Sequence, residues 1–505
     1  MNFTDCNSSS RYAVLRLTEQ SLRDLETLLF RRYPQEEWAT FIRFGYRRTT
    51  WGLVLTLVDL IPPDAGDLDE GSPIVVLKAR YSRRALIAAE NGELAIGVIH
   101  SHPKGCHVAP SSLDDEMDDY FAGEFAAYSG GAPYVSAIFA RDEIGHLQVS
   151  GRIVDGDDVL PLREMFVVGT QLQRLSSPLI AAAPTTVEMP LESPTARLES
   201  VYGEASARIL RESTAGIVGC SGTGSPAAHV LARAGVCRFV LVDFDDFSPS
   251  NHERFHASTW KDCIATTPRK KNVMLAELIR SINPNAEIVL CQGNVLDEHV
   301  LDELLRCDFL LGCTDTHHAR LALSEYAIHY NLPVLDTGVL MEGEYGIINC
   351  QTIEVTEYGP ALPCALCGGT INTQRLNVEL MSPQAKAQAV KAAELANAKG
   401  LDGTQYWNGE PPTLPTVGYL TTTAGALLAG YAIGKVTGAF ATPASRFQFD
   451  IGFPHLGYVA VPRRLRTTCR CGTLGGWADQ ARAYRNVARP DHFAEPEFAR
   501  FPKSG

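Results

Sequence analysis

Two histidines and an aspartate have a spacing that suits a metal ion. In the segment HSHPKGCHVAPSSLDD, His100 and His102 are two residues apart and Asp114 follows a Pro-Ser turn. Residues i and i+2 of a strand project from the same face. Two imidazoles and one carboxylate leave the fourth position of zinc open for a water, whose pKa the metal lowers to about 7. The segment therefore predicts a hydrolytic zinc site. Such a site also needs a general base, usually a glutamate, to accept the proton of the water.

The same residues resemble a known peptidase signature. His-x-His-Pro, a spacer and then Ser-x-x-Asp form the pattern of the JAMM (MPN-plus, Mov34-like) metallopeptidases. The resemblance implies a catalytic glutamate ahead of an early strand, for which Glu37 fits best and Glu36 is the near alternative. It also implies that Ser111 helps to stabilise the oxyanion of a tetrahedral intermediate.

The residues beside this signature leave one local ambiguity. Ser112 and Asp115 also satisfy the Ser-x-x-Asp spacing, although the Pro-Ser sequence favours Ser111 and Asp114. His107 lies between the two halves of the signature, and we expect it to be a surface residue of the loop rather than a ligand.

A second cluster is a glycine turn between an expected strand and an expected helix. Gly219, Gly222 and Gly224 lie in GIVGCSGTGSPAAHVLARAGV. Glycines let the backbone approach a phosphate, which then meets the positive N-terminus of the helix. Asp243 ends the next expected strand, where an acid can hold a ribose hydroxyl. Such a turn alone fits an NAD enzyme equally well.

The residues after that strand resemble a second family. VDFDDFSPSNHER follows the Asp-x-Asp, Ser-Asn-x-x-Arg pattern of the ThiF/MoeB and ubiquitin-activating enzymes. The residues at the positions of that family are Asp243, Asn251, Arg254, Lys271 and Asp315. The resemblance implies that the chain binds ATP and magnesium, with Asp315 as the magnesium ligand.

The chemistry of adenylation explains why these residue types occur together. The reaction brings a carboxylate to the triphosphate of ATP, and these two anions repel each other. Lys271, Arg254 and a magnesium ion near Asp315 would offset that charge. By family analogy, Arg197 is a possible counterpart of an arginine that reaches a neighbouring active site. Ser221 replaces the usual glycine, and we expect ATP binding to survive this change.

Two cysteine pairs predict a structural zinc site. Cys364 and Cys367 stand where the activating family carries half of such a site. Cys469 and Cys471 are the expected second half, with one intervening residue where the family commonly has two. Four thiolates suit tetrahedral zinc.

The segment between these pairs lacks a residue that many activating enzymes use. No cysteine occurs between Cys367 and Cys469, so the usual thioester step is in doubt. A hydroxyl acceptor would need an adjacent base. Either the adenylate passes directly to a partner, or one of the following takes its place: Thr413, Thr416, Thr421 or Cys350. The threonines fit packing and capping roles better.

Length, composition and charge limit the classes of function that the protein can have. The chain has 505 residues, of which 45% are hydrophobic and 20% charged, so two or three folded domains are expected. A net charge of -13 argues against general affinity for nucleic acid or an anionic membrane. No apolar run reaches the roughly 20 residues of a membrane span, the start lacks a signal pattern, and we expect the protein in the cytoplasm.

The order of expected elements indicates two domains of different class. We expect an α+β JAMM-like zinc domain with a mixed sheet over 1–164 and a linker over 165–197. Alternating strands and helices predict a Rossmann-like, doubly wound, mostly parallel sheet over 198–480. A tail would follow over 481–505.

The combined expectation is a bifunctional enzyme of a ubiquitin-like pathway. One module would adenylate the C-terminal glycine of a ubiquitin-like protein for a conjugating partner, and the zinc module would process or release the same protein. The main alternative is sulfur-carrier activation and processing for cysteine, thiamine or molybdopterin synthesis. An inactive binding scaffold is an alternative of another class. Family analogy implies a homodimer.

Overall fold

The chain divides into two units. The structure, a computed structural model, describes residues 11–69, 74–90, 94–180, 193–407, 409, 416–442, 444–452, 459–460, 469–481 and 497–500. The N-terminal unit comprises Met1–Glu188, Ile328–Leu332 and Arg470–Arg482. The C-terminal unit comprises Met189–Ala327, Pro333–Cys469 and Ala483–Gly505.

A mixed eight-stranded sheet forms the centre of the N-terminal unit within the described ranges. The strand order is β1-β3-β2-β4-β5-β6-β7-β8, and a further pairing of β1 with β7 closes the sheet on itself. β1 is parallel to β3 and β7, and β4 is parallel to β5. The strands are β1 (Tyr12–Thr18), β2 (Ala39–Thr49), β3 (Gly52–Ile61), β4 (Ala95–Ser101), β5 (Tyr134–Arg141), β6 (Leu147–Asp155), β7 (Asp158–Val168) and β8 (Leu172–Ser176).

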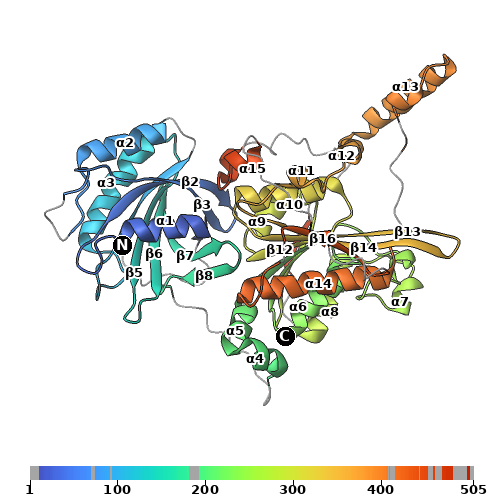
Figure 1. The fold of residues 1–505 in the computed structure, drawn as a ribbon, viewed down its shortest axis with the longest axis horizontal. Helices are drawn as coiled ribbons and strands as arrows, with labels where there is room; N and C mark the ends of the chain where they lie inside the picture. The colour runs from blue at the N-terminus through green and yellow to red at the C-terminus, as the bar shows by residue number, and fades with distance from the viewer. Residues whose placement is uncertain are drawn as a thin grey trace. The chain divides into compact units, whose positions relative to one another are not determined.

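Helices cover both faces of this sheet (Figure 1). The face that carries Ile42 packs against α1 (Glu19–Leu29). The opposite face, which carries Phe41, packs against α2 (Ala79–Glu90) and α3 (Ser112–Tyr128). Alternation along each strand therefore decides which helix a side chain meets.

Two segments from later in the sequence complete the N-terminal unit. Arg47 of β2 places its Nη1 3.2 Å from Oδ1 of Asp479, and the Tyr330 hydroxyl donates to the same oxygen. The Arg47 side chain is 5% exposed and that of Asp479 is 11% exposed. A buried charge of this kind needs its partner, so residues beyond 320 belong to the fold of this unit. They include α15 (Arg470–Thr473) and η5 (Ala478–Ala481).

A nine-stranded sheet forms the C-terminal unit within the described ranges. The order is β16-β15-β14-β13-β12-β9-β10-β11-β17, with β13, β12, β9, β10 and β11 parallel. The strands are β9 (Thr214–Val218), β10 (Arg238–Val242), β11 (Glu287–Gln292), β12 (Phe309–Gly312), β13 (Val334–Glu344), β14 (Ile347–Tyr358), β15 (Arg446–Asp450), β16 (Val459–Ala460) and β17 (Glu497–Arg500).

Helices lie on both faces of this second sheet (Figure 1). The long helix α14 runs beside α6 along β13 and β14, and α9 and α10 lie on the other face. The helices are α4 (Ala196–Tyr202), α5 (Glu204–Glu212), α6 (Gly224–Arg233), α7 (Trp260–Cys263), α8 (Lys271–Ile282), α9 (Glu298–Leu304), α10 (His317–His329), α11 (Ala365–Gly368), α12 (Thr373–Leu380), α13 (Pro383–Ala398) and α14 (Gly418–Thr437), with 3-10 turns η2 (Pro249–Asn251) and η3 (Gly403–Gln405).

The structure corrects three expectations about architecture. A linker does not begin at residue 165, because Met165 is buried in β7 opposite Leu15 of β1 and β8 follows. The second sheet is parallel only in its central five strands, because a two-residue hairpin turn at Tyr345 and Gly346, both with positive φ, returns the chain antiparallel. The expected tail contains β17, which pairs with β11.

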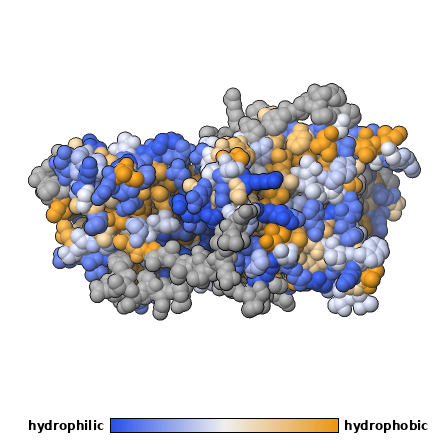
Figure 2. Space-filling model, turned by 90° about the horizontal axis from the view of Figure 1, so that it is seen from below, coloured by the Kyte–Doolittle hydropathy of each residue, from blue (hydrophilic) through white to orange (hydrophobic). Residues whose placement is uncertain are grey.

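No helix in the described part of the chain is long and apolar enough to cross a membrane. In the view of Figure 2, hydrophobic residues form several small groups among hydrophilic ones. The most exposed large apolar side chains include Tyr345, which is 94% exposed, and Trp260, which is 71% exposed.

Candidate functional site

The structure brings His100, His102 and Asp114 together. His100 is the last residue but one of β4, and α3 carries Asp114 over the same sheet face. The two Nε2 atoms of the histidines are 3.2 Å apart, and Asp114 Oδ1 and Oδ2 lie 3.2 Å from His100 Nε2 and 3.9 Å from His102 Nε2 respectively. Both histidines are buried.

These three groups fit a zinc ion. Ligand atoms about 2.0–2.1 Å from tetrahedral zinc lie about 3.3 Å from each other, close to two of the three distances above. The Nδ1 atom of His102 is 2.6 Å from the carbonyl oxygen of His107. A proton on Nδ1 leaves the lone pair of Nε2 facing the other two groups. His107 thus contributes its backbone carbonyl.

Hydrogen bonds at the start of α3 hold the carboxylate of Asp114 in place and lower its pKa. Burial raises the pKa of Asp114, but the hydrogen bond and charge of His100 and the donors of Ser111 more than offset this, so the pKa lies well below its ordinary value. Ser111 is the N-cap, and both its backbone N–H and its hydroxyl donate to Asp114 Oδ2. Asp115 instead pairs with Arg152. The structure therefore places Asp114, not Asp115, beside the histidines.

Glu37 lies on the same side of the sheet as this cluster. Ala39 pairs with His100 across β2 and β4, and one step further Ser101 N–H donates to the carbonyl oxygen of Trp38. Continuing this register puts Glu37 opposite His102, on the face that α3 covers. Glu37 Oε2 accepts a bond of 3.2 Å from the N–H of Val75.

The alternative base, Glu36, has a different partner. It forms an ion pair of 2.7 Å with Arg32. Glu36 therefore already balances a cation, which leaves Glu37 as the better-placed glutamate.

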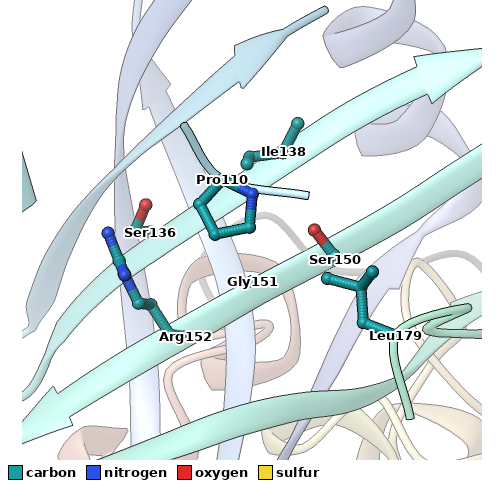
Figure 3. Close-up of a pocket in the computed structure, with 7 residues that line it drawn as sticks. All are labelled: Pro110, Ser136, Ile138, Ser150, Gly151, Arg152 and Leu179. Atoms are coloured by element: carbon teal, nitrogen blue, oxygen red, sulfur yellow. The ribbon is translucent and has the colours of Figure 1, made fainter. Parts of the chain in front are cut away.

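A small pocket lies beside the loop that carries these residues (Figure 3). Pro110, directly before Ser111, lines it together with side chains of β5 and β6. Arg152 reaches the pocket while its Nε binds Asp118 at 2.7 Å. The members are Pro110, Ser136, Ile138, Ser150, Gly151, Arg152 and Leu179. Arg152 thus fixes α3 through Asp115 and Asp118, one turn beyond the aspartate of the cluster.

The two cysteine pairs also meet in the structure. The sulfur atoms of Cys364, Cys367, Cys469 and Cys471 all lie within 4.8 Å of one another. The Sγ atoms of Cys364 and Cys469 are 3.8 Å apart, which is about the spacing that zinc–sulfur bonds of 2.3 Å give in a tetrahedron. The geometry fits a structural zinc ion.

The strand order of the second sheet reverses at the glycine turn. The chain passes from β9 to β10 on one side and returns to β12 on the other. Where the strand order reverses in this way, ligands bind outside the carboxyl ends of the strands. β9 leads into the turn, β10 leads into Asp243, and β12 leads into the loop of Asp315.

The glycines of this turn have no room for side chains. A Cβ on Gly224 would lie 1.9 Å from the carbonyl oxygen of Gly219, and Gly219 itself has φ +91°. A Cβ on Gly222 would lie 3.2 Å from Cδ of Arg254 and 3.3 Å from Oγ1 of Thr421. The turn is therefore tightly packed against its own backbone, and Arg254 and Thr421 lie beside it.

Charged groups converge on the turn. Asp243 accepts hydrogen bonds of 2.8 Å from Cys220 N–H and 2.9 Å from Asp245 N–H. Burial raises the pKa of Asp243 to about 6, although the charge of Lys271 acts in the opposite direction. Lys271 is 8% exposed and its Nζ lies 2.8 Å from Asp245 Oδ2.

Three polar atoms around the turn have no hydrogen-bond partner among the described residues. They are Ser221 Oγ, Arg254 Nε and Thr314 Oγ1, all buried. Buried polar atoms usually have partners, and phosphate oxygens would supply them here. Asp315 is exposed one residue beyond Thr314, where it is free to bind magnesium. ATP and magnesium therefore fit the residues present.

The candidate acyl acceptors differ in position. Thr416 accepts a hydrogen bond from Arg254 Nη1, and Thr421 is buried beside the glycine turn. Cys350 lies in β14 with its Sγ 3.1 Å from Thr352 Oγ1. Thr413 lies outside the described residues.

Other predicted residues occupy unremarkable positions. Asn251 is buried at the end of η2, where its Oδ1 accepts a 3.1 Å bond from Ser248 N–H. Arg197 lies in the first turn of α4, which buries none of its residues.

An ion pair that the sequence patterns above do not predict lies behind the Asp315 loop. Arg320 of α10 lies 3.4 Å from Asp336 of β13 and donates to the carbonyl oxygen of Thr337 at 3.1 Å. Burial raises the pKa of Asp336 to about 7 despite the charge of Arg320. Asp336 is the acid in the apolar segment VLDTG, and an acid in such a segment is the sequence feature that could have indicated this pair.

A model of the ThiF family matches residues 193–471, which is more than half of the chain. The chain belongs to the ThiF family. The match includes the glycine turn, Asp243, Arg254, Lys271 and Asp315, and it ends at the last residue of the cysteine cluster.

Several curated relatives of this ThiF-family chain are adenylyltransferases by name, and one is "tRNA threonylcarbamoyladenosine dehydratase" of Escherichia coli K12, with 30% identity over 32% of this chain and 57% of that protein. The chain is similar to "Sulfur carrier protein ThiS adenylyltransferase" of Escherichia coli K12, with 32% identity over 24% of this chain and 46% of that protein. It is similar to "Adenylyltransferase and sulfurtransferase MOCS3" of Drosophila willistoni, with 30% identity over 31% of this chain and 32% of that protein. "Molybdopterin-synthase adenylyltransferase" of Haemophilus influenzae is 30% identical over 27% of this chain and 54% of its own. The chain thus spans between a third and about half of these proteins.

The chain is also similar to a solved structure, E. coli MccB with MccA-N7isoASN. The identity is 16%, the match covers 56% of this chain and 77% of that chain, and the TM-score is 0.42.

We predict that the purified full chain holds two zinc ions and that His100→Ala holds one. Removal of one imidazole leaves two ligands, too few to retain zinc, while the cysteine cluster is unchanged. Elemental analysis after dialysis measures the content. His107→Ala is the matched control, because only the backbone of His107 contacts the cluster, and equal zinc in His100→Ala and the wild type would contradict the site.

We predict that Asp243→Asn changes the dependence of stability on pH. The folded pKa of about 6 lies above the ordinary 3.8, so the carboxyl group contributes stability below pH 4 that is lost as pH rises through 6. Relative to the asparagine variant, the wild type should lose about 3 °C of thermal midpoint between pH 5 and pH 7. Parallel pH profiles of the two proteins would contradict the raised pKa.

Proposed function

We propose that the C-terminal unit adenylates the C-terminal carboxylate of a small ubiquitin-like protein of the sulfur-carrier type. The observation that carries this proposal is the glycine turn between Asp243 and the Asp315 loop, with Arg254 and Lys271 on its rim. Membership of the ThiF family and the similarity to two bacterial adenylyltransferases support the same reaction.

The positions of the residues suggest their roles. Asp243 would accept the ribose hydroxyls of ATP, and the N–H groups of the turn would face the phosphates. An oxygen of the protein carboxylate attacks the α-phosphorus, and pyrophosphate leaves. Arg254 and Lys271 would balance the charge that develops on pyrophosphate. A magnesium ion at Asp315 would neutralise further phosphate charge.

Sulfur transfer explains the missing cysteine better than conjugation does. An acyl adenylate can receive sulfur from a separate donor, so the enzyme needs no thiol of its own. The cysteines beside the turn are poor nucleophiles, because burial raises the pKa of Cys313 to about 12 and that of Cys220 well above its ordinary value. Transfer of the adenylated carrier to a conjugating partner is the alternative, and the product test below separates it from sulfur transfer. The homodimer stays a prediction that these tests do not require.

A second activity is proposed for the N-terminal unit, zinc-dependent cleavage of an amide at the end of the same carrier. The specific observation in its favour is the placement of His100, His102 and Asp114 around one point, with Glu37 on the same face. Glu37 would take the proton of the zinc-bound water, and Ser111 would stabilise the oxyanion. A binding scaffold would have no need for such a complete set of groups.

We predict ATP–pyrophosphate exchange that depends on a glycine-ended carrier. Lys271→Ala and Arg254→Ala should each lower the exchange rate about a hundredfold or more, because a charge that stabilises the transition state is lost. Radiolabelled pyrophosphate measures the rate. Lys399→Ala, on the exposed end of α13, is the control, and no exchange with any glycine-ended carrier would overturn the proposal.

The product distinguishes the two fates of the adenylate. With a sulfur donor present, mass spectrometry of the carrier should show a thiocarboxylate. A lysine-linked conjugate instead would support the conjugating pathway.

We predict that the chain removes a residue or a fused tag from the C-terminal glycine of the carrier. Glu37→Gln should abolish cleavage while zinc content stays at the wild-type value, because the variant loses only the base. Glu36→Gln should cleave normally. Cleavage of an extended carrier, followed by gel and mass analysis, is the measurement, and activity retained in Glu37→Gln would exclude this role.

A further inference from the structure

The loop of Asp315 leads into a helix whose first turn binds a carboxylate from a distant segment. Glu379 of α12 belongs to the crossover segment, residues 368–468, between the two cysteine pairs. Its Oε2 accepts a hydrogen bond of 2.9 Å from the backbone N–H of His318. The same oxygen lies 3.2 Å from Nδ1 of His318. Glu379 therefore caps α10 from 61 residues away in sequence.

This contact is buried and charged. The side chain of His318 is 9% exposed and that of Glu379 is 14% exposed. Burial raises the pKa of Glu379, but the hydrogen bonds from the ring of His318 and from the backbone of His318 and His317 lower it below its ordinary value. The carboxylate is therefore ionised, and an anion at the N-terminus of a helix is stabilising.

The opposite side of the same helix turn is tied to the sheet. Arg320 pairs with Asp336 and donates to the carbonyl oxygen of Thr337. Its Nη2 also lies 3.4 Å from the carbonyl oxygen of Thr314. The loop between β12 and α10 is short, from Cys313 to Thr316. Fixing the first turn of α10 from both sides leaves the backbone at Asp315 little freedom.

We propose that Glu379 is a positioning residue for adenylation: by capping α10 it holds the Asp315 loop in the form that receives magnesium. The crossover segment then takes part in nucleotide binding without touching the nucleotide. This inference rests on the proposed function of the C-terminal unit. It also implies the reverse, that magnesium and ATP bound at Asp315 strengthen the attachment of α12.

The test is the magnesium requirement of nucleotide binding, which needs no carrier protein. Calorimetry of ATP binding at a series of magnesium concentrations is carried out on the full chain. Glu379→Ala should raise the magnesium concentration for half-maximal binding about tenfold, the size of effect expected for a lost charged cap. At saturating magnesium the affinity for ATP should equal that of the wild type.

Two further variants separate positioning from folding. Glu379→Gln keeps an oxygen that accepts from His318 N–H, so it should recover part of the wild-type magnesium requirement. Glu394→Ala removes an exposed glutamate of α13 in the same segment and should change nothing. An ATP affinity that falls equally at all magnesium concentrations would assign Glu379 a structural role and overturn the inference.

Hydrogen exchange supplies an independent reading. Peptides that cover Cys313–Leu321 should exchange faster in Glu379→Ala, and adding ATP with magnesium to the wild type should slow exchange in α12. If the wild type binds no ATP, the proposed function fails. If it binds ATP and the variant has an unchanged magnesium requirement, only the role of Glu379 fails.

Discussion

In the proposed reaction, the electrostatic repulsion between a protein carboxylate and the triphosphate of ATP is the constraint that the C-terminal unit must meet. A fold that joins these anions must place positive charge and metal at one point and keep the backbone close. The reversal of strand order at β9 provides that point, because three strand ends meet there. Each strand end leads into one part of the candidate site: the glycine turn after β9, Asp243 after β10, and Asp315 after β12.

The N-terminal unit brings the residues of its candidate metal cluster together in a different way. Its candidate metal ligands come from the end of β4 and from α3, which begins after ten intervening residues. Alternation on β2 and β4 assigns Glu37 and both histidines to one face, and the capping box at Ser111 turns Asp114 toward them. The network of Arg152 then holds α3 at a fixed place on the sheet. Local rules of strand and helix geometry are therefore enough to assemble this cluster.

Sequence reasoning was most successful where short-range rules apply. Strand ends, glycine turns and metal-ligand spacings are local, and the structure places those residues together. Contacts such as Glu379 with His318 or Arg320 with Asp336 depend on tertiary packing, and no pattern in one sequence pairs residues so far apart.

The discontinuous composition of the N-terminal unit has a practical consequence for dissecting the protein. A fragment cut after residue 188 would keep Arg47 on β2 but would lack the later segments that pack on this strand, with the carboxylate of Asp479 and the hydroxyl of Tyr330. Removing the carboxylate that pairs with a buried guanidinium is strongly destabilising. Separate expression of the two halves is therefore a poor way to assign their activities, and point substitutions in the intact chain are the better genetic tool.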